Sequence, residues 1–181
     1  MLYVIRHGRT DWNEMRKMQG RTDIPLNETG RQMAKDASER YRDVNFDICY
    51  CSPLSRARET AEILLKGRNI PIINDERLVE MSFGDYEGSN KDAQEAGAPI
   101  WELFEHPESY IPSGGAESFE ELFARTADFL KNTAEPLLQE GKDLLIVGHG
   151  AMNSAIVCQV KNIPLKDFWK GSIKNCELIQ L

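Results

Sequence analysis

Two of the three histidines in this 181-residue sequence follow apolar runs and stand beside glycines. His7 lies in the stretch VIRHG, and His149 lies in LLIVGHGAMNSAIV. An apolar run that leads into polar side chains and a flexible turn is typical of a buried strand whose tip carries chemistry. In an open parallel sheet, ligands bind beyond the carboxyl ends of the strands, where both tips would meet. We therefore predict that His7 and His149 face one site, although either histidine alone is as readily a half-buried structural residue.

An arginine and a glutamate are candidates for the same site. If Ser52 caps a helix, Arg56 lies near the first turn of that helix, where a guanidinium and free backbone N–H groups bind an anion together. A surface ion pair is the simpler interpretation of Arg56 taken alone. Glu80 follows a short apolar pair and precedes a glycine-aromatic turn, in a position where a lone glutamate is ordinarily solvated. Asp85 and Glu87 are close enough in sequence to take the role of Glu80 as an acid.

The elements that must position these residues alternate between strand and helix. Strand-like runs cover residues 1–5, 46–51, 70–74, 143–148 and 176–181. Amphipathic segments at 30–42 and 119–139 follow pairs with capping-box spacing, Thr29 with Gln32 and Ser118 with Glu121. A third helix is predicted to start at Ser52, with Pro53 in its first turn. No linker, repeat or low-complexity run interrupts this order, which predicts one α/β domain over residues 1–181.

One segment departs from the alternation. Residues 84–115 are rich in Gly, Pro and acidic residues, so we predict an irregular insertion with one short helix near 99–105. Such segments often form the lid or wall of a site. His106 in this insertion is expected at the surface, and Asp11 and Trp12 are expected to pack at the start of a loop.

Composition limits the classes of partner. The sequence is 41% hydrophobic and 28% charged, with a net charge of −7 and a pI near 5.1. This acidic balance argues against nucleic acid as a partner, because phosphate-backbone binding relies on clustered Lys and Arg. Neither a signal peptide nor an apolar run of about 20 residues is found, so we expect a cytoplasmic location and no membrane partner. The four cysteines lack zinc spacing and are expected to be reduced and packed; the oligomeric state, a homodimer included, stays open.

Five stretches in order carry a family resemblance. RHGRTDWN, QGRTDIPLNETGRQMA, SPLSRARETA, EMSFGDYEG and VGHG resemble the motifs of the histidine phosphatases, the phosphoglycerate-mutase-like superfamily, over nearly the whole length. The resemblance implies a single three-layer α/β domain with a mostly parallel central sheet flanked by helices. It also implies a phosphohistidine mechanism without metal or other cofactor. The implied pocket comprises Arg6, His7, Asn13, Arg56, Glu80 and His149.

The implied chemistry explains why these residue types are needed. Neutral His7 would attack phosphorus through one ring nitrogen while an acceptor such as a backbone carbonyl holds the proton of the other. The two arginines and His149 would hold the phosphoryl oxygens, with Asn13 as a neutral donor. Glu80, if burial keeps it protonated, would protonate the departing alkoxide and then deprotonate the attacking water.

Other residues have weaker support as contacts of the substrate. Gly8 is expected to let the backbone approach the phosphate closely. Thr22 and the backbone of Gly150 are further candidates for substrate binding, and Arg9 and Arg21 either line the mouth of the site or are merely exposed.

The sequence also favours one reaction type within the family. Mutases usually read ERHYG after the acid and carry further basic residues for the substrate carboxylate, whereas Met81 and Ser82 stand here and the following segment is acidic. The sequence is short for a mutase, with no long tail beyond Leu181 to shield a phosphoenzyme from water. We predict a metal-independent phosphatase for a small phosphorylated metabolite, similar to the α-ribazole phosphatase group in length and in FGDYEG. The alternatives are a cofactor-dependent phosphoglycerate mutase and a non-catalytic phosphate-binding protein.

Overall fold

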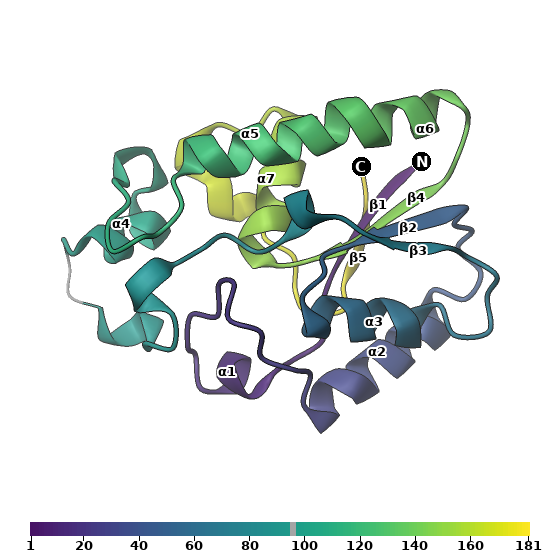
Figure 1. The fold of residues 1–181 in the computed structure, drawn as a ribbon, viewed down its shortest axis with the longest axis horizontal. Coiled ribbons are helices and arrows are strands. Elements are labelled where there is room, and N and C mark those ends of the chain that lie inside the picture. The colour runs from purple at the N-terminus through teal and green to yellow at the C-terminus, as the bar shows by residue number, and fades with distance from the viewer. Residues whose placement is uncertain (95–96) are drawn as a thin grey trace.

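A central sheet lies between two layers of helices in this computed structural model, which describes residues 1–94 and 97–181 (Figure 1). Within these residues the sheet has five strands, in the order β3-β2-β4-β1-β5. They are β1 (Leu2–Arg6), β2 (Ile48–Cys51), β3 (Ile72–Asn74), β4 (Leu144–Gly148) and β5 (Leu178–Gln180). Only β5 runs antiparallel to its neighbour among these strands. The predicted α/β class with a mostly parallel sheet is confirmed; four strands fall within predicted runs, and β1 extends one residue beyond its run, to Arg6.

Side chains that alternate along the strands divide the core into two clusters. In β4, Leu144 and Ile146 belong to one cluster, whereas Leu145 and Val147 belong to the other, as the two-residue period of a strand requires. The first cluster packs under α5 (Phe119–Phe129), α6 (Glu135–Gln139) and α7 (Gly150–Lys161). The second packs under α2 (Glu28–Arg40) and α3 (Ser55–Leu64). Figure 1 shows these helices on opposite sides of the sheet.

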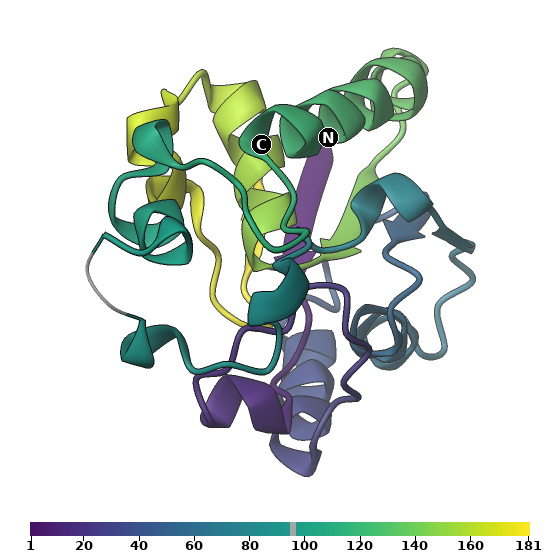
Figure 2. The ribbon, with the colours of Figure 1, turned by 60° about the vertical axis from the view of Figure 1, so that its left-hand side comes forward.

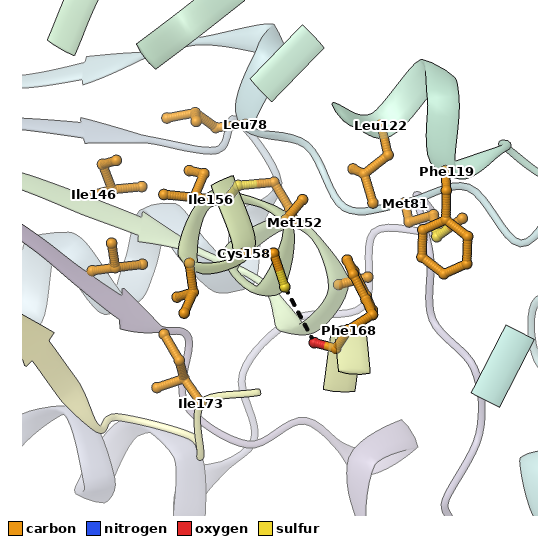
Figure 3. Close-up of a cluster of buried hydrophobic side chains, with 14 of the residues drawn as sticks. Leu78, Met81, Phe119, Leu122, Ile146, Met152, Ile156, Cys158, Phe168 and Ile173 are labelled. Carbon is orange, nitrogen blue, oxygen red and sulfur yellow. Dashed lines mark hydrogen bonds between the residues drawn. The ribbon is translucent and has the colours of Figure 1, made fainter. Parts of the chain in front are cut away.

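Helix α7 is the centre of the first cluster. Every side chain from Ala151 to Cys158 is buried, and the apolar side chains of Met152 and Ile156 project into the cluster around it (Figure 3). Cys158 Sγ donates to the carbonyl of Phe168, 3.5 Å away, in η6 (Leu165–Gly171). All four cysteines are buried and free, as predicted. Burial of this helix fixes its N-terminus, which matters for the site described below.

Two predicted helix starts are wrong. Helix α2 begins at Glu28 because the Asn27 side chain accepts the N–H of Gly30 at 2.9 Å, so Asn27 is the cap in place of the predicted Thr29 and Gln32 pair. Helix α3 begins at Ser55, three residues later than predicted from Ser52 and Pro53. Its first N–H donates to the carboxylate of Asp23, at 2.8 Å. A cap supplied from a distant loop leaves no signal in the sequence next to the helix.

The predicted helix at 119–139 is continuous but not uniform. The capping box of Ser118 and Glu121 is confirmed. Between α5 and α6 the chain makes one wide π-turn, η5 (Leu130–Ala134). Pro136 lies in the first turn of α6; a proline has no N–H to donate and its ring crowds the carbonyl four residues earlier, which favours a wider turn at this point.

The remaining segments surround the carboxyl ends of the strands. They are α1 (Asp11–Glu14), α4 (Pro99–Glu105) and the short turns η1 (Glu76–Leu78), η2 (Gly84–Tyr86), η3 (Lys91–Ala93) and η4 (Pro107–Ser109). The short helix predicted at 99–105 is confirmed, whereas Asp11 and Trp12 begin a helix instead of a loop. Figure 2 shows the predicted insertion, 84–115, beside the N-terminal loop and η6; its residues 95–96 lie outside the described residues.

Two smaller expectations concern single residues. His106 is exposed, as predicted. Cys176 lies just before β5 and not within it, because its φ of 56° is incompatible with an extended strand. In the described part of the chain, no helix has the length and the apolar character needed to span a membrane.

Candidate active site

The sheet register brings the two motif histidines together. Arg6 at the end of β1 pairs with Gly148 at the end of β4, and the N–H of His7 donates to the Gly148 carbonyl at 3.0 Å. The rings of His7 and His149 therefore lie side by side, with centroids 5.2 Å apart and planes inclined by 60°. Both rings are buried. The prediction that these two strand tips meet is confirmed.

The His7 ring is held in one tautomer. Its Nδ1 lies 2.6 Å from the carbonyl oxygen of Gly8, which can only accept a hydrogen bond. Nδ1 therefore carries the hydrogen, and Nε2 keeps its lone pair. Burial, followed by the positive charges of Arg56 and Arg6, holds the pKa of His7 well below its usual value. The ring is thus neutral at pH 7, the state in which Nε2 is a nucleophile.

Two arginines lie beside this nitrogen. Arg56, in the first turn of α3, is 1% exposed and donates to the carbonyls of Thr22 at 2.9 Å and Gly20 at 2.7 Å. Arg6 donates to the Ile173 carbonyl at 3.3 Å. The Nε atoms of both guanidinium groups are buried without a partner in the described residues. Burial lowers the pKa of Arg56 to about 10, so it remains a cation at neutral pH. A buried and a half-buried cation with unused N–H groups form a strong anion site.

Glu80 caps the helix that begins after His149. Its Oε1 accepts the N–H groups of Met81 and Met152, each at 2.9 Å, and its Oε2 accepts that of Ala151 at 3.2 Å. Glu80 is buried, lines the same cavity as His7, and its negative charge lies close enough to Arg6 to oppose the lowering of that arginine's pKa by burial. A carboxylate held by three backbone donors beside a nucleophile has a fixed position for proton transfer.

The neighbouring acids are used differently. The Glu87 carboxylate accepts the N–H groups of Arg21, Thr22 and Phe83 at 2.9–3.1 Å, and the Thr22 hydroxyl also donates to it. Asp85 is exposed. Neither acid lines the cavity, so the geometry favours Glu80 over both.

His149 is the residue just before α7. Its Nε2 lies 2.7 Å from the hydroxyl of Ser52, and its Nδ1 is buried with no partner in the described residues. Burial, followed by the charges of Arg56, His7 and Arg6, holds the pKa of His149 well below its usual value. This ring is also neutral at pH 7.

A cavity of about 730 Å³ lies against Arg6, His7, Arg56 and Glu80, whereas the fully buried His149 does not line it. Its inner end is formed by Arg6, His7, Arg56, Glu80 and Gly150. Four further cations, which we call the rim cations, lie farther out: Arg9, Arg16, Lys17 and Lys91. Three aromatic residues, which we call the aromatic wall, also line it: Phe83, Phe104 and Trp169. The rings of Phe104 and Trp169 stack with centroids 5.3 Å apart. The cavity has room for much more than a phosphate group.

Some of the remaining predicted site residues line this cavity and others do not. Asn13, Gly150 and Arg9 line it, but Thr22 and Arg21 do not. The Thr22 hydroxyl is bound to Glu87, and Arg21 forms an ion pair with Glu117 at 3.3 Å.

Gly8 does not line the cavity, and the structure gives a second reason for a glycine at this position. A Cβ at Gly8 would clash with the Gly30 carbonyl, so the residue must be glycine for the packing of α2 against the end of β1. The Gly8 N–H is also already used, because it donates to the Thr60 hydroxyl at 3.0 Å.

Sequence reasoning missed most of the rim cations and the whole aromatic wall. The acidic composition after Glu80 predicted that basic residues for a substrate carboxylate are missing there, whereas Lys91 of that segment lines the cavity. The chain at 16–18 pairs with the chain at 88–91, where Lys91 N–H donates to the Arg16 carbonyl at 3.2 Å and Met18 N–H donates to the Ser89 carbonyl at 3.0 Å. The available signal was the pair of lysines in MRKMQG and SNKD, but their meeting depends on contacts remote in sequence.

We also looked for side chains that could bind a metal ion. Within residues 1–94 and 97–181, no group of three or more His, Cys, Asp and Glu side chains is arranged to hold a metal ion.

Known proteins are similar to this chain in sequence. The family model described as the histidine phosphatase superfamily (branch 1) matches residues 2–181. A Bacillus subtilis protein named uncharacterized phosphatase PhoE is 38% identical over 87% of this chain and 75% of its own. A 2,3-bisphosphoglycerate-dependent phosphoglycerate mutase of Cytophaga hutchinsonii is 34% identical over 92% of this chain and 80% of its own.

Solved structures agree with this assignment. Bacillus stearothermophilus YhfR superposes with a TM-score of 0.88 at 36% identity, over 98% of this chain and 88% of that one. The α-ribazole phosphatase from Shigella flexneri superposes with a TM-score of 0.83 at 28% identity, over 98% of this chain and 87% of that one. With a family match that spans the chain and motif histidines that meet at the strand tips, this protein belongs to the histidine phosphatase superfamily.

Proposed function

We propose that this protein hydrolyses small phosphate monoesters through a phosphohistidine formed on His7. The observation that carries the proposal is the 2.6 Å contact of His7 Nδ1 with the Gly8 carbonyl, which leaves Nε2 unprotonated at the inner end of the cavity. A neutral imidazole with a fixed tautomer is the form that attacks phosphorus.

In the first step, His7 Nε2 forms a bond to phosphorus and the bond from phosphorus to the ester oxygen breaks. Glu80, which takes up a proton as the substrate enters the site, transfers that proton to the departing alkoxide. Arg6, Arg56 and His149 hold the phosphoryl oxygens as charge develops on them. Asn13 and the N–H of Gly150 are further donors to the same group.

In the second step, water attacks the phosphohistidine. Glu80, now a carboxylate, takes a proton from the water. The oxygen of the water bonds to phosphorus as the phosphorus–nitrogen bond breaks. Inorganic phosphate leaves, and His7 and Glu80 return to their starting states. Glu80 is buried at the N-terminus of α7, and this supports the double role because one fixed carboxyl group can serve in both steps.

The leaving group would occupy the outer cavity between the rim cations and the aromatic wall. A volume of about 730 Å³ supports an organic group considerably larger than phosphate. Similarity to proteins named as phosphatases, an α-ribazole phosphatase among them, supports hydrolysis as the reaction.

Mutase activity is a second candidate because of the rim cations. Arg9, Lys17 and Lys91 provide positive charge that a substrate carboxylate or second phosphate would need, whereas Arg16 is already paired with Asp92. One relative is named as a bisphosphoglycerate-dependent mutase. Isomerisation of 3-phosphoglycerate in the presence of bisphosphoglycerate, at a rate above that of phosphate release, would favour this candidate.

The direct test is phosphate release from a panel of monoesters with EDTA present. The panel comprises p-nitrophenyl phosphate, α-ribazole phosphate, sugar phosphates and 3-phosphoglycerate. We expect turnover by the wild type, its loss in His7→Ala, and its retention in His106→Ala, which removes an exposed histidine outside the site. Labelled phosphate should be trapped on the wild type and not on His7→Ala. Absence of turnover on every ester by folded wild type, or full activity of His7→Ala, would overturn the proposal.

A further inference from the structure

Ser52 is buried beside the site, yet no step above uses it. It follows β2 and does not line the cavity, and its Oγ lies 2.7 Å from Nε2 of His149. The N–H of Leu54 donates to the same oxygen, at 3.3 Å. The helix cap predicted for Ser52 is not formed, because α3 begins at Ser55. The position of this hydroxyl therefore calls for another role.

The hydroxyl hydrogen decides which group donates in this contact. Ser52 Oγ already accepts from Leu54, and the described part of the chain offers its hydrogen no acceptor besides His149 Nε2. If the ring donated instead, the buried hydroxyl hydrogen would have no acceptor, which is unfavourable in free energy. Ser52 thus donates, and His149 Nε2 accepts.

The other ring nitrogen then carries the hydrogen. A neutral imidazole whose Nε2 accepts must be protonated on Nδ1. The His149 Nδ1 is buried and has no partner in the described residues, and the ring lies 5.2 Å from that of the nucleophile His7. A buried N–H beside a nucleophile, with no protein acceptor, is suited to an oxygen of the substrate.

We propose that Ser52 is a positioning residue that fixes His149 in the Nδ1–H tautomer, so that a neutral N–H donor meets a phosphoryl oxygen. This inference rests on the phosphatase activity proposed above. In the opposite tautomer, the lone pair of Nδ1 would face the phosphoryl oxygen and repel it. Because charge on that oxygen grows in the transition state, loss of the donor affects kcat more than KM.

The tautomer can be measured without any turnover. Nitrogen-15 NMR of the histidine rings near pH 7.5 distinguishes a protonated from an unprotonated ring nitrogen. The chain has three histidines, so His149→Gln and His106→Gln assign the signals. We expect an unprotonated Nε2 and a protonated Nδ1 for His149 in the wild type, and a shift toward protonated Nε2 in Ser52→Ala. A protonated Nε2 in the wild type would overturn the inference, whether or not the protein is a phosphatase.

Kinetics test the consequence. We expect kcat for p-nitrophenyl phosphate to fall by about tenfold to a hundredfold in Ser52→Ala with little change in KM, less than the loss of a direct donor. Ser52→Thr, which keeps a hydroxyl, should recover most of kcat. Ser38→Ala is the matched control, because it removes a hydroxyl that donates to the Leu64 carbonyl at 2.8 Å away from the cavity. An active wild type with an unchanged kcat in Ser52→Ala refutes the positioning role, whereas an inactive wild type refutes only the proposed function.

Discussion

The Glu80→Gln substitution tests the assignment of the acid most sharply. Glutamine keeps the shape of the side chain and removes the exchangeable proton. Its carbonyl oxygen can retain the two 2.9 Å hydrogen bonds to Met81 and Met152, but its amide group would face the N–H of Ala151. One hydrogen bond to a charged acceptor is lost, so the free energy of unfolding should fall by about 1.5–3 kcal/mol.

The kinetic effect depends on the leaving group. An alkyl phosphate must release an alkoxide, so loss of the acid should lower kcat/KM by about 10²–10⁴-fold. This corresponds to about 3–5 kcal/mol of barrier. p-Nitrophenolate hardly needs a proton, and its kcat/KM should fall by less than about tenfold. The constant kcat/KM is the right measure because it reports the first phosphoryl transfer and is insensitive to the later hydrolysis of the phosphohistidine.

Displacement of α7 is the main competing cause, and it would affect both substrates alike. Glu87→Gln is the matched control, because Glu87 also accepts three backbone N–H groups but does not line the cavity. We expect Glu87→Gln to lower stability and to change both kcat/KM values by the same factor. Equal losses on both substrates in Glu80→Gln would remove Glu80 from the acid role.

Three further predictions concern charge and packing at the site. The pKa values of His7 and His149 lie below their usual value of 6.5 in the folded chain, so the unfolded chain binds more protons below that pH. The free energy of unfolding should therefore fall as the pH drops, by up to about 1.4 kcal/mol per pH unit for each ring. Urea unfolding between pH 7 and 5.5 measures this slope, which should flatten when both histidines are replaced by glutamine. Arg56→Lys should lower kcat/KM by about 10²–10³-fold, because an ammonium group cannot keep both backbone contacts and also bind phosphate with a fork of N–H groups; a loss below tenfold in steady-state assays would contradict this role. Gly8→Ala should destabilise the fold by about 1–3 kcal/mol in thermal unfolding, because the added methyl group would meet the Gly30 carbonyl. Unchanged stability with lost activity would instead favour a role for Gly8 beside the phosphate.

Features set by local pattern were predictable from the sequence. Apolar runs give the strands, and the glycine after each histidine marks the strand tips, so the meeting of His7 and His149 followed from sheet topology alone. The capping box at Ser118 was likewise correct, because both of its partners lie within four residues of sequence.

Features set by remote contacts were not predictable in this way. Ser52 has the residue type of a helix cap, but its hydroxyl is bound to His149, and Asp23 meets the first N–H of α3 in its place. Lys91 reaches the cavity because its segment pairs with a loop more than 70 residues earlier. Trp169 joins the aromatic wall by a hydrogen bond of 2.8 Å to the Leu103 carbonyl. In each case the partner is chosen by tertiary structure, which no local window contains.

The place of β1 in the sheet governs when the protein can become active during its own synthesis. Among the five described strands, β1 is synthesised before the others, whereas its neighbours in the sheet are β4 and β5, which are synthesised after the other three. Until β4 emerges, more than 130 residues later, the apolar side chains of β1 have no strand to pair with and Arg6 and His7 have no fixed position. A chain that lacks β4 therefore cannot hold a partial site, and phosphate chemistry begins only when β4 and β5 have closed the sheet around β1.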